Sequence, residues 1–165
     1  MAKLDLPDSQ AAYAVFAALP FLVIGCVAGW QQVREPSAER TAAALESLRG
    51  LSWEEFSAAL EGAFRRDGYD VTRVNIAGAD FELAKSGRLS LVSCKRWKAA
   101  RTGIEPLREL DAARQTRAAH EGIYVAAGEI SENAIAFAAA NNIHLLLGAE
   151  LAQFLPIAKQ FSPRS

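Results

Sequence analysis

The stretch Gly78–Lys98, which reads GADFELAKSGRLSLVSCKRWK, decides the fold of this chain. We predict two short strands joined by a tight turn at Ser86-Gly87, because glycine supplies the positive φ that hairpin turns need. Asp80 and Glu82 alternate with apolar residues along the first strand, so both carboxylates share one face. The hairpin therefore combines a buried apolar face with a strongly acidic one.

The second strand of the hairpin brings a cation beside these two acids. Ser93 and Lys95 share one of its faces, whereas Cys94 lies on the other. Asp80, Glu82 and Lys95 can thus hold a divalent metal and a cation next to a phosphate. Metal-assisted phosphodiester hydrolysis requires this combination of groups.

Length and charge limit the class of protein. The 165 residues can form one domain with a sizeable core plus accessory segments. Since the formal net charge is −1, any binding to nucleic acid must depend on a local patch. Cys26 and Cys94 lack the spacing of a metal site or a disulfide framework, and they predict buried free thiols in a reducing compartment. The sequence contains no phosphate-cradling glycine loop, which argues against a nucleotide cofactor.

A long apolar segment lies near the start of the chain. Ala11–Trp30 contains no charged residue, and a helix of this length spans about 30 Å, the thickness of the hydrocarbon core of a bilayer. Aromatic residues lie near both of its ends, and Pro20 is tolerated better in a membrane helix than in a soluble one. We predict a transmembrane helix over residues 11–31 after a short tail over residues 1–10.

Two other interpretations of this segment remain open. It would also suit a buried core helix. Residues 23–26 resemble a lipoprotein signal, but the leading segment carries Asp5 and Asp8 against Lys3, whereas a signal peptide begins with a basic region.

The basic residues around the segment predict its orientation. Arg34, Arg40 and Arg49 follow it, and Lys3 alone precedes it. The positive-inside rule then places the C-terminal part in the cytoplasm. We expect a single-pass protein of the bacterial inner membrane.

The remaining chain alternates between helical and extended patterns. Residues 32–50 predict a helical linker, residues 51–158 a folded domain and residues 159–165 a loose tail. The domain begins with a capping box, in which Ser52 is the N-cap and Glu55 follows three residues later. Further elements are expected at Tyr69–Asn75 (strand), Ile104–Ala119 (helix), Gly122–Ala127 (strand), Glu132–Ala140 (helix), Ile143–Leu147 (strand) and Ala149–Leu155 (helix). This order predicts an α/β fold, a mixed sheet with helices on both faces.

Several short patterns occur together in one order along the domain. They are Glu55-Phe56, Gly68-Tyr69, the Asp80 strand, Cys94-Lys95-Arg96-Trp97, Arg108-Glu109-Leu110, Ala134-x-x-Phe137-Ala138 and Leu146-x-Gly148-x-Glu150-Leu151. The set resembles the catalytic domain of the Mrr-like restriction endonucleases over about Leu51–Leu155. This resemblance implies the restriction-endonuclease-like fold, a PD-(D/E)-x-K site and cleavage of DNA that depends on Mg²⁺, for which Mn²⁺ substitutes. Some relatives act on modified or foreign DNA.

The resemblance also implies roles for individual residues. Asp80 matches the metal-binding aspartate of the family, and Lys95 matches its lysine. The family has Glu or Gln where this chain has Ser93, which either hydrogen-bonds a metal-bound water or has no role. Glu82 offers a replacement carboxylate on the same strand face, or it is an exposed residue paired with Arg88.

Two further features flank this expected site. Similar nucleases place a helical acid at the metal, which makes Glu55 a candidate ligand, although its capping-box role already explains it. Arg96, Lys98 and Arg101 form a basic cluster that either binds DNA phosphates or is a solvated loop. Trp97 lies among them and either stacks on a ligand or packs in the core.

The sequence therefore predicts a membrane-tethered, metal-dependent DNA endonuclease. A homodimer is expected, because cleavage of both strands usually needs two sites. The alternative is a catalytically degenerate domain that binds DNA or a protein partner without cleavage, and Ser93 is the residue that favours it. A third interpretation is a membrane-tethered structural protein that only retains the fold.

Overall fold

The predicted hairpin lies at the centre of the computed structural model, which describes residues 38–155. Strands β2 (Ala79–Lys85) and β3 (Arg88–Ser93) pair in antiparallel fashion. The two residues between them have positive φ values, 52° for Ser86 and 75° for Gly87. Positive φ at both central positions is the requirement of a type I′ hairpin turn, so the predicted turn is confirmed.

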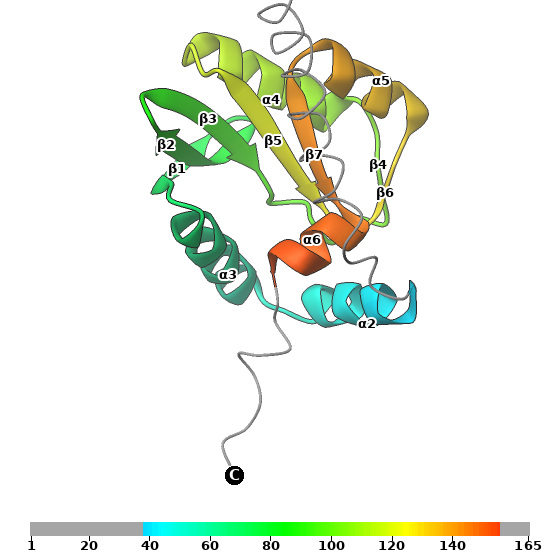
Figure 1. Cartoon of the computed structure of the whole chain (residues 1–165). Coiled ribbons are helices and arrows are strands. Elements are labelled where there is room, and N and C mark those ends of the chain that lie inside the picture. Colours follow the sequence, from blue (N-terminus) through cyan, green and yellow to red (C-terminus); the bar gives the residue numbers. More distant parts are fainter. Residues whose placement is uncertain (1–37, 156–165) are drawn as a thin grey trace, which may run out of the picture. The chain divides into compact units, whose positions relative to one another are not determined.

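A five-stranded mixed sheet is built around this hairpin. Its strand order is β1-β2-β3-β5-β7, with antiparallel pairing from β1 to β3 and parallel pairing from β3 to β7 (Figure 1). The mixed sheet is therefore confirmed. The elements not yet given are α2 (Ala38–Arg49), α3 (Trp53–Arg66), β1 (Asp70–Ile76), β4 (Arg101–Thr102), α4 (Glu105–Thr116), β5 (Glu121–Ala126), β6 (Glu129–Ile130), α5 (Glu132–Ala140), β7 (Ile143–Leu147) and α6 (Gly148–Phe154).

Helices cover both faces of the sheet, as the alternating pattern predicts. Helices α2, α3 and α6 lie on one face, and α4 and α5 lie on the other (Figure 1). Strand β5 is buried on both sides: Ile123 and Val125 pack toward the first layer, Tyr124 and Ala126 toward the second. Burial on both faces explains why this strand is a continuous apolar run in the sequence.

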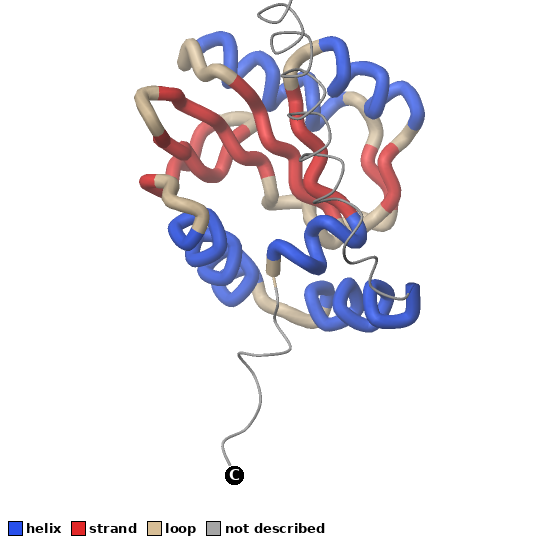
Figure 2. Tube along the Cα trace, in the orientation of Figure 1, coloured by secondary structure: helices blue, strands red, loops and turns tan. Residues whose placement is uncertain are grey.

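A second, very small sheet was not predicted. Strands β4 and β6 have two residues each and pair in parallel at the edge of the domain (Figure 2). Strands this short carry no periodicity that a sequence pattern can show. Gly128 permits the close approach beside them, because a Cβ there would lie 2.0 Å from the carbonyl oxygen of Ala99. The small sheet fixes the position of the chain that follows the hairpin, because β4 pairs with β6.

The helix expected in the linker is present as α2, and its C-terminal end packs into the domain. Leu48 is fully buried in the core, and the Arg49 guanidinium donates a hydrogen bond to the carbonyl oxygen of Ala127 (2.9 Å). The predicted tail 1–10, transmembrane helix 11–31 and loose tail 159–165 lie outside the described residues. Between Ala38 and Leu155, no helix has both the length and the apolarity needed to cross a membrane.

A capping box starts α3, as predicted. The Ser52 hydroxyl accepts from the Glu55 amide (3.2 Å), and the Glu55 carboxylate accepts from the Ser52 amide (2.8 Å). Because these two bonds satisfy amide groups that the helix leaves free, they fix where α3 begins. Trp53 is consequently the first helical residue.

Replacement of the capping hydroxyl should destabilise the domain. We expect Ser52→Ala to lower the free energy of unfolding by about 1 kcal/mol, the usual cost of a lost N-cap. Urea denaturation followed by tryptophan fluorescence measures this value. Ser47→Ala is the matched control, because Ser47 bonds the carbonyl of Ala43 within α2 and caps nothing. An equal loss in both variants would contradict the capping role.

Candidate active site

A β-bulge in β1 lies directly opposite Asp80. Two β1 residues, Val74 and Asn75, stand against this single residue of β2. Bulges bend a strand, change the direction of its side chains and are frequent beside active sites. The bulge therefore marks the Asp80 end of the hairpin as the place where the regular ladder is broken.

Two backbone hydrogen bonds hold the Asp80 carboxylate. Its Oδ2 accepts from the amide of Cys94 (2.8 Å) and from the amide of Lys95 (2.9 Å). Both donors belong to the chain that leaves β3. Hydrogen bonds to an ionised carboxylate are stronger than those between neutral groups. They therefore hold the Asp80 carboxylate against the backbone of Lys95.

Asp80 and Lys95 also line one open cavity, with a volume of about 290 Å³. Lys95 is exposed, and no ion pair between described residues engages it. The remaining wall consists of Trp53, Arg73, Val74, Asn75 and Phe81. The structure thus brings together the acid and the lysine that the sequence selected, in a space open to a ligand.

Cys94, whose amide bonds Asp80, is a free, buried thiol, as predicted. Burial raises the pKa of the Cys94 thiol well above its usual value, and the neighbouring Asp80 carboxylate raises it further. The thiol is therefore kept neutral, and Cys94 acts as a small apolar residue beside the acid.

Ser93 is the last residue of β3 and is half-buried. It is paired with Tyr124 of β5, and continuing the β2–β3 register places it opposite Asp80. Burial raises the pKa of the Tyr124 hydroxyl. Of the neighbouring charges, Arg96 lowers this pKa, whereas Glu109 and Asp80 raise it. Ser93 is thus beside the acid, as expected, but it contributes only a neutral hydroxyl.

Glu82 has a different environment from Asp80. Its carboxylate accepts from the guanidinium of Arg117 at the end of α4 (3.2 Å). It is not one of the residues lining the cavity. The two acids are only two residues apart on one strand. Asp80 faces the bulge of β1, whereas Glu82 pairs with Arg117 at the end of α4.

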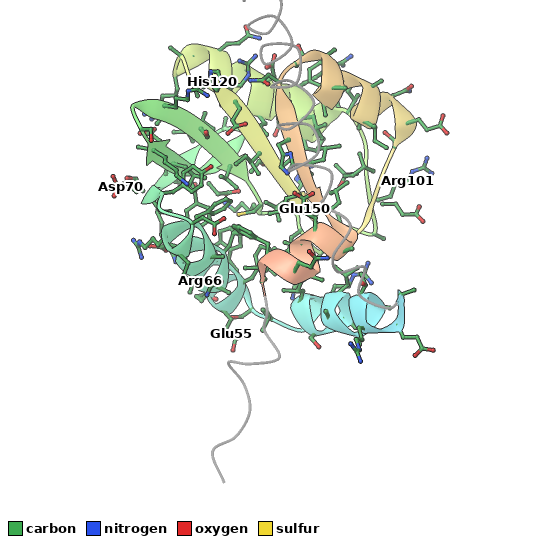
Figure 3. All side chains as sticks on the ribbon, in the orientation of Figure 1. Glu55, Arg66, Asp70, Arg101, His120 and Glu150 are labelled. Carbon is green, nitrogen blue, oxygen red and sulfur yellow. The ribbon has the colours of Figure 1, made fainter. Side chains whose placement is uncertain are left out.

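Glu55 projects from α3 away from the sheet (Figure 3). Hydrogen bonds from Ser52 lower the pKa of Glu55, and the charge of nearby Lys98 lowers it further. Its carboxylate is therefore committed to the capping box. The structure does not bring Glu55 into the cavity that Asp80 lines.

The predicted basic cluster is exposed along the segment that follows β3. Arg96 and Lys98 lie in the turn after the strand, and Arg101 lies on β4 at the edge of the domain (Figure 3). The Lys98 ammonium is also 5.2 Å from the centre of the Trp97 ring. No ion pair within residues 38–155 neutralises these three cations. The segment presents unpaired positive charge from the residue after Lys95 to the edge of the domain.

The donor set around Asp80 determines how a divalent metal could bind. Over residues 38–155, no group of three or more His, Cys, Asp or Glu side chains lies together as metal ligands. Mg²⁺ is commonly held by one or two carboxylates together with substrate phosphates, and it keeps several waters. One carboxylate in an open cavity fits such a site, in which the nucleic acid supplies the other ligands.

Five residues of the cavity were not selected from the sequence, and three of them carry a polar or aromatic group that could contact a ligand. Trp53 comes from the start of α3, and Arg73 and Asn75 come from the bulged end of β1. Arg73 is held by Glu61 (2.8 Å) and lies over the Phe81 ring. A bulge leaves no local pattern in a sequence, so nothing indicated which β1 residue would meet Asp80.

Comparison with known proteins identifies the family. A family model described as a restriction endonuclease, the Mrr catalytic domain, matches residues 48–155 of the 165. The chain belongs to this restriction endonuclease family. None of the curated proteins compared matches this restriction endonuclease domain.

One solved structure agrees with this assignment at the level of the fold. The modification-dependent restriction endonuclease AspBHI superimposes with a TM-score of 0.52 and 18% identity over 77% of this chain and 39% of its own. MspJI, solved with a 27-mer oligonucleotide, gives 0.48 and 19% over 73% and 32%, and the protein of unknown function AF1548 gives 0.45 and 16% over 52% of each. The chain spans about half of AF1548 and about a third of the two endonucleases. The likeness to AspBHI shows a shared fold.

The capping carboxylate predicts a pH dependence of stability. Because the pKa of Glu55 is lowered in the folded state, its contribution is present above the unfolded value of about 4.3 and is lost as the pH falls through the folded value. We expect Glu55→Gln to be less stable than wild type at pH 7 and equal to it at low pH. Urea unfolding at several pH values measures the difference. Glu54→Gln, one residue outside the box, should show no such convergence, and a similar curve for it would contradict the assignment.

Proposed function

We propose that this chain is a metal-dependent endonuclease that hydrolyses phosphodiester bonds of DNA. The observation that carries the proposal is the Asp80 carboxylate, bound by the amide of Lys95 in the cavity that the Lys95 side chain also lines. Membership of the restriction endonuclease family supports the same reaction class. The cavity is open, so a DNA backbone can approach both groups.

Each of the two residues has a distinct role in this proposal. Asp80 holds Mg²⁺, or Mn²⁺ in its place, through a carboxylate that the backbone has already oriented. The metal, when bound there, stabilises charge on the phosphoryl oxygens as a Lewis acid. Lys95 lies across the cavity, where its ammonium stabilises the charge that develops during attack or orients the attacking water.

Two nearby residues modify the site. Ser93 would hydrogen-bond water in the metal site, at the position where the family has Glu or Gln. Glu82 lies about 7 Å along the strand from Asp80, and its participation requires release from Arg117. The metal is therefore held more weakly than in a site with two free acids, and DNA completes it.

The basic segment supplies affinity for DNA in this proposal. Arg96 and Lys98 lie in the same turn as Lys95, and Arg101 lies on β4 at the edge of the domain. None of the three carries an ion pair with another described residue. Contacts from Lys and Arg to phosphates release counterions and do not depend on base sequence. These residues position the backbone over the cavity.

We propose a cellular setting from the sequence alone. Ala11–Trp30 tethers the domain to the inner membrane on its cytoplasmic side, and the domain acts in restriction of foreign or modified DNA. Cleavage of both strands is carried out by a homodimer.

One observation favours a second function, a degenerate domain that binds DNA or a protein partner without cleavage. The acid expected before Lys95 is Ser93, and Glu82 is paired with Arg117. Asp80 is then the one acid among the described residues that line the cavity. The exposed cations would still bind DNA in such a protein.

Removal of either central group should abolish cleavage. We expect Asp80→Asn and Lys95→Ala each to reduce cleavage of supercoiled plasmid by at least about 100-fold in Mg²⁺, because each removes transition-state stabilisation. The full-length chain is assayed with Mg²⁺, with Mn²⁺ and with chelator.

Two matched variants control this experiment. Asp70→Asn lies at the start of β1, and Lys85→Ala lies at the turn end of the hairpin; both residues are exposed. These variants should cleave as wild type does. Full activity of Lys95→Ala would exclude the mechanism, and cleavage in chelator would exclude the metal.

Restoring an acid at position 93 separates the two candidate functions. If the chain is an enzyme, Ser93→Glu should lower the Mg²⁺ concentration for half-maximal cleavage by about tenfold or more, since the metal gains a charged ligand. Ser47→Glu adds the same charge to α2, outside the cavity, and should change nothing. Cleavage by Ser93→Glu from an inactive wild type would instead establish the degenerate domain.

A further inference from the structure

The cavity beside Asp80 has an aromatic wall that the hydrolysis does not require. Trp53 is half-buried and lines the cavity together with Asp80 and Lys95. It is the first residue of α3, where the capping box fixes the backbone. An indole held at the edge of an active site is available to a ligand.

Contacts behind the indole hold it in place. Its ring centre lies 5.7 Å from that of Trp97, and Trp97 is stacked on Phe56 at 4.3 Å. Both of these partners are buried. Trp53 is therefore supported by a row of aromatic rings and keeps its remaining surface toward the cavity.

The rest of the wall has the composition of a site for one planar ring. Val74 and Phe81 are apolar, and Asn75 is an exposed carboxamide placed there by the bulge. The volume of about 290 Å³ is at the lower limit for small-molecule pockets, ~300 Å³. This space is too small for a base pair with its stacked neighbours.

We propose that the cavity binds a single unpaired nucleobase of the DNA next to the scissile phosphate. Trp53 stacks on the face of the base, and Asn75 hydrogen-bonds its edge. The inference rests on the proposed function, because the phosphate at Asp80 and Lys95 brings the neighbouring base to Trp53. The preferred substrate class is thus single-stranded DNA, or duplex with an unpaired nucleotide at the cleavage site.

The physical reason for this preference is access to the base. In a duplex, both faces of a base are covered by its neighbours, and taking it out of the stack has an energetic cost. An unpaired base offers its face without that cost, and stacking on an aromatic side chain is tolerant of sequence. Lys95 and the cations after it act on either form of DNA through the phosphates alone.

Binding measurements without cleavage test the proposal. The full-length chain is titrated in chelator with a fluorescent single-stranded oligonucleotide and, separately, with the same sequence as a blunt duplex. We expect Trp53→Leu to weaken single-strand binding by about fivefold or more and duplex binding by less than about twofold. Trp53→Phe keeps an aromatic face and should retain most of the single-strand affinity.

Asn75→Ala provides an independent variant, because Asn75 is exposed and bonds to no core residue between Ala38 and Leu155. It should weaken single-strand binding by about threefold and leave duplex binding unchanged. Asn133→Ala, an exposed residue of α5 on the other face of the sheet, is the matched control.

Each outcome decides the proposal. Selective loss of single-strand binding supports it, whereas equal loss on both DNAs, or no loss, overturns it. If Trp53→Leu does not fold in a thermal melt, Asn75→Ala decides in the same way. Because the readout is binding in chelator, failure here leaves the plasmid assay of Asp80→Asn as the separate test of hydrolysis.

Discussion

The arrangement of the site depends on the pair of hydrogen bonds between the Asp80 carboxylate and the amides of Cys94 and Lys95. They connect the end of β2 to the chain that leaves β3, so the acid and the lysine cannot move apart independently. A carboxylate that accepts two backbone bonds keeps a fixed direction, and its other oxygen is left for a ligand. The bulge in β1 then opens the space into which this group faces.

The turn that carries Lys95 is held from the core side as well. The amide of Trp97 donates to the carbonyl of Cys94 (3.1 Å), and the indole is buried against Phe56. Trp97 thus packs in the core, one of the two roles the sequence left open. This segment therefore joins the turn that carries Lys95 to α3, while α3, β1 and β2 supply the rest of the cavity wall and keep its geometry.

The distribution of charge around the cavity suits a polyanion. Among the described residues that form the cavity wall, Asp80 is the one acid, and Arg73 and Lys95 are the cations. Glu82 is turned to Arg117 and Glu55 to the cap of α3, so two of the three candidate acids are occupied elsewhere. An acid in excess would repel phosphate, whereas the single Asp80 carboxylate stands beside the exposed Lys95 ammonium, a cation that can attract it.

Local patterns in the sequence specify most of the elements and their order, and the two-residue strands β4 and β6 are the exception. The hairpin turn, the capping box, the helix Glu132–Ala140 and the strand Ile143–Leu147 are observed as predicted, because local patterns of apolar residues and caps specify them. The sequence also selected Asp80 and Lys95, through the period of two along the hairpin and the family resemblance. The second strand was expected to include Lys95, but β3 ends at Ser93 and Lys95 lies in the turn that follows. Only the tertiary structure decided the bulge, the Glu82–Arg117 pair and the place of Trp53 in the cavity wall. Each of these depends on contacts between segments far apart in the chain, and such contacts leave no trace in a local pattern.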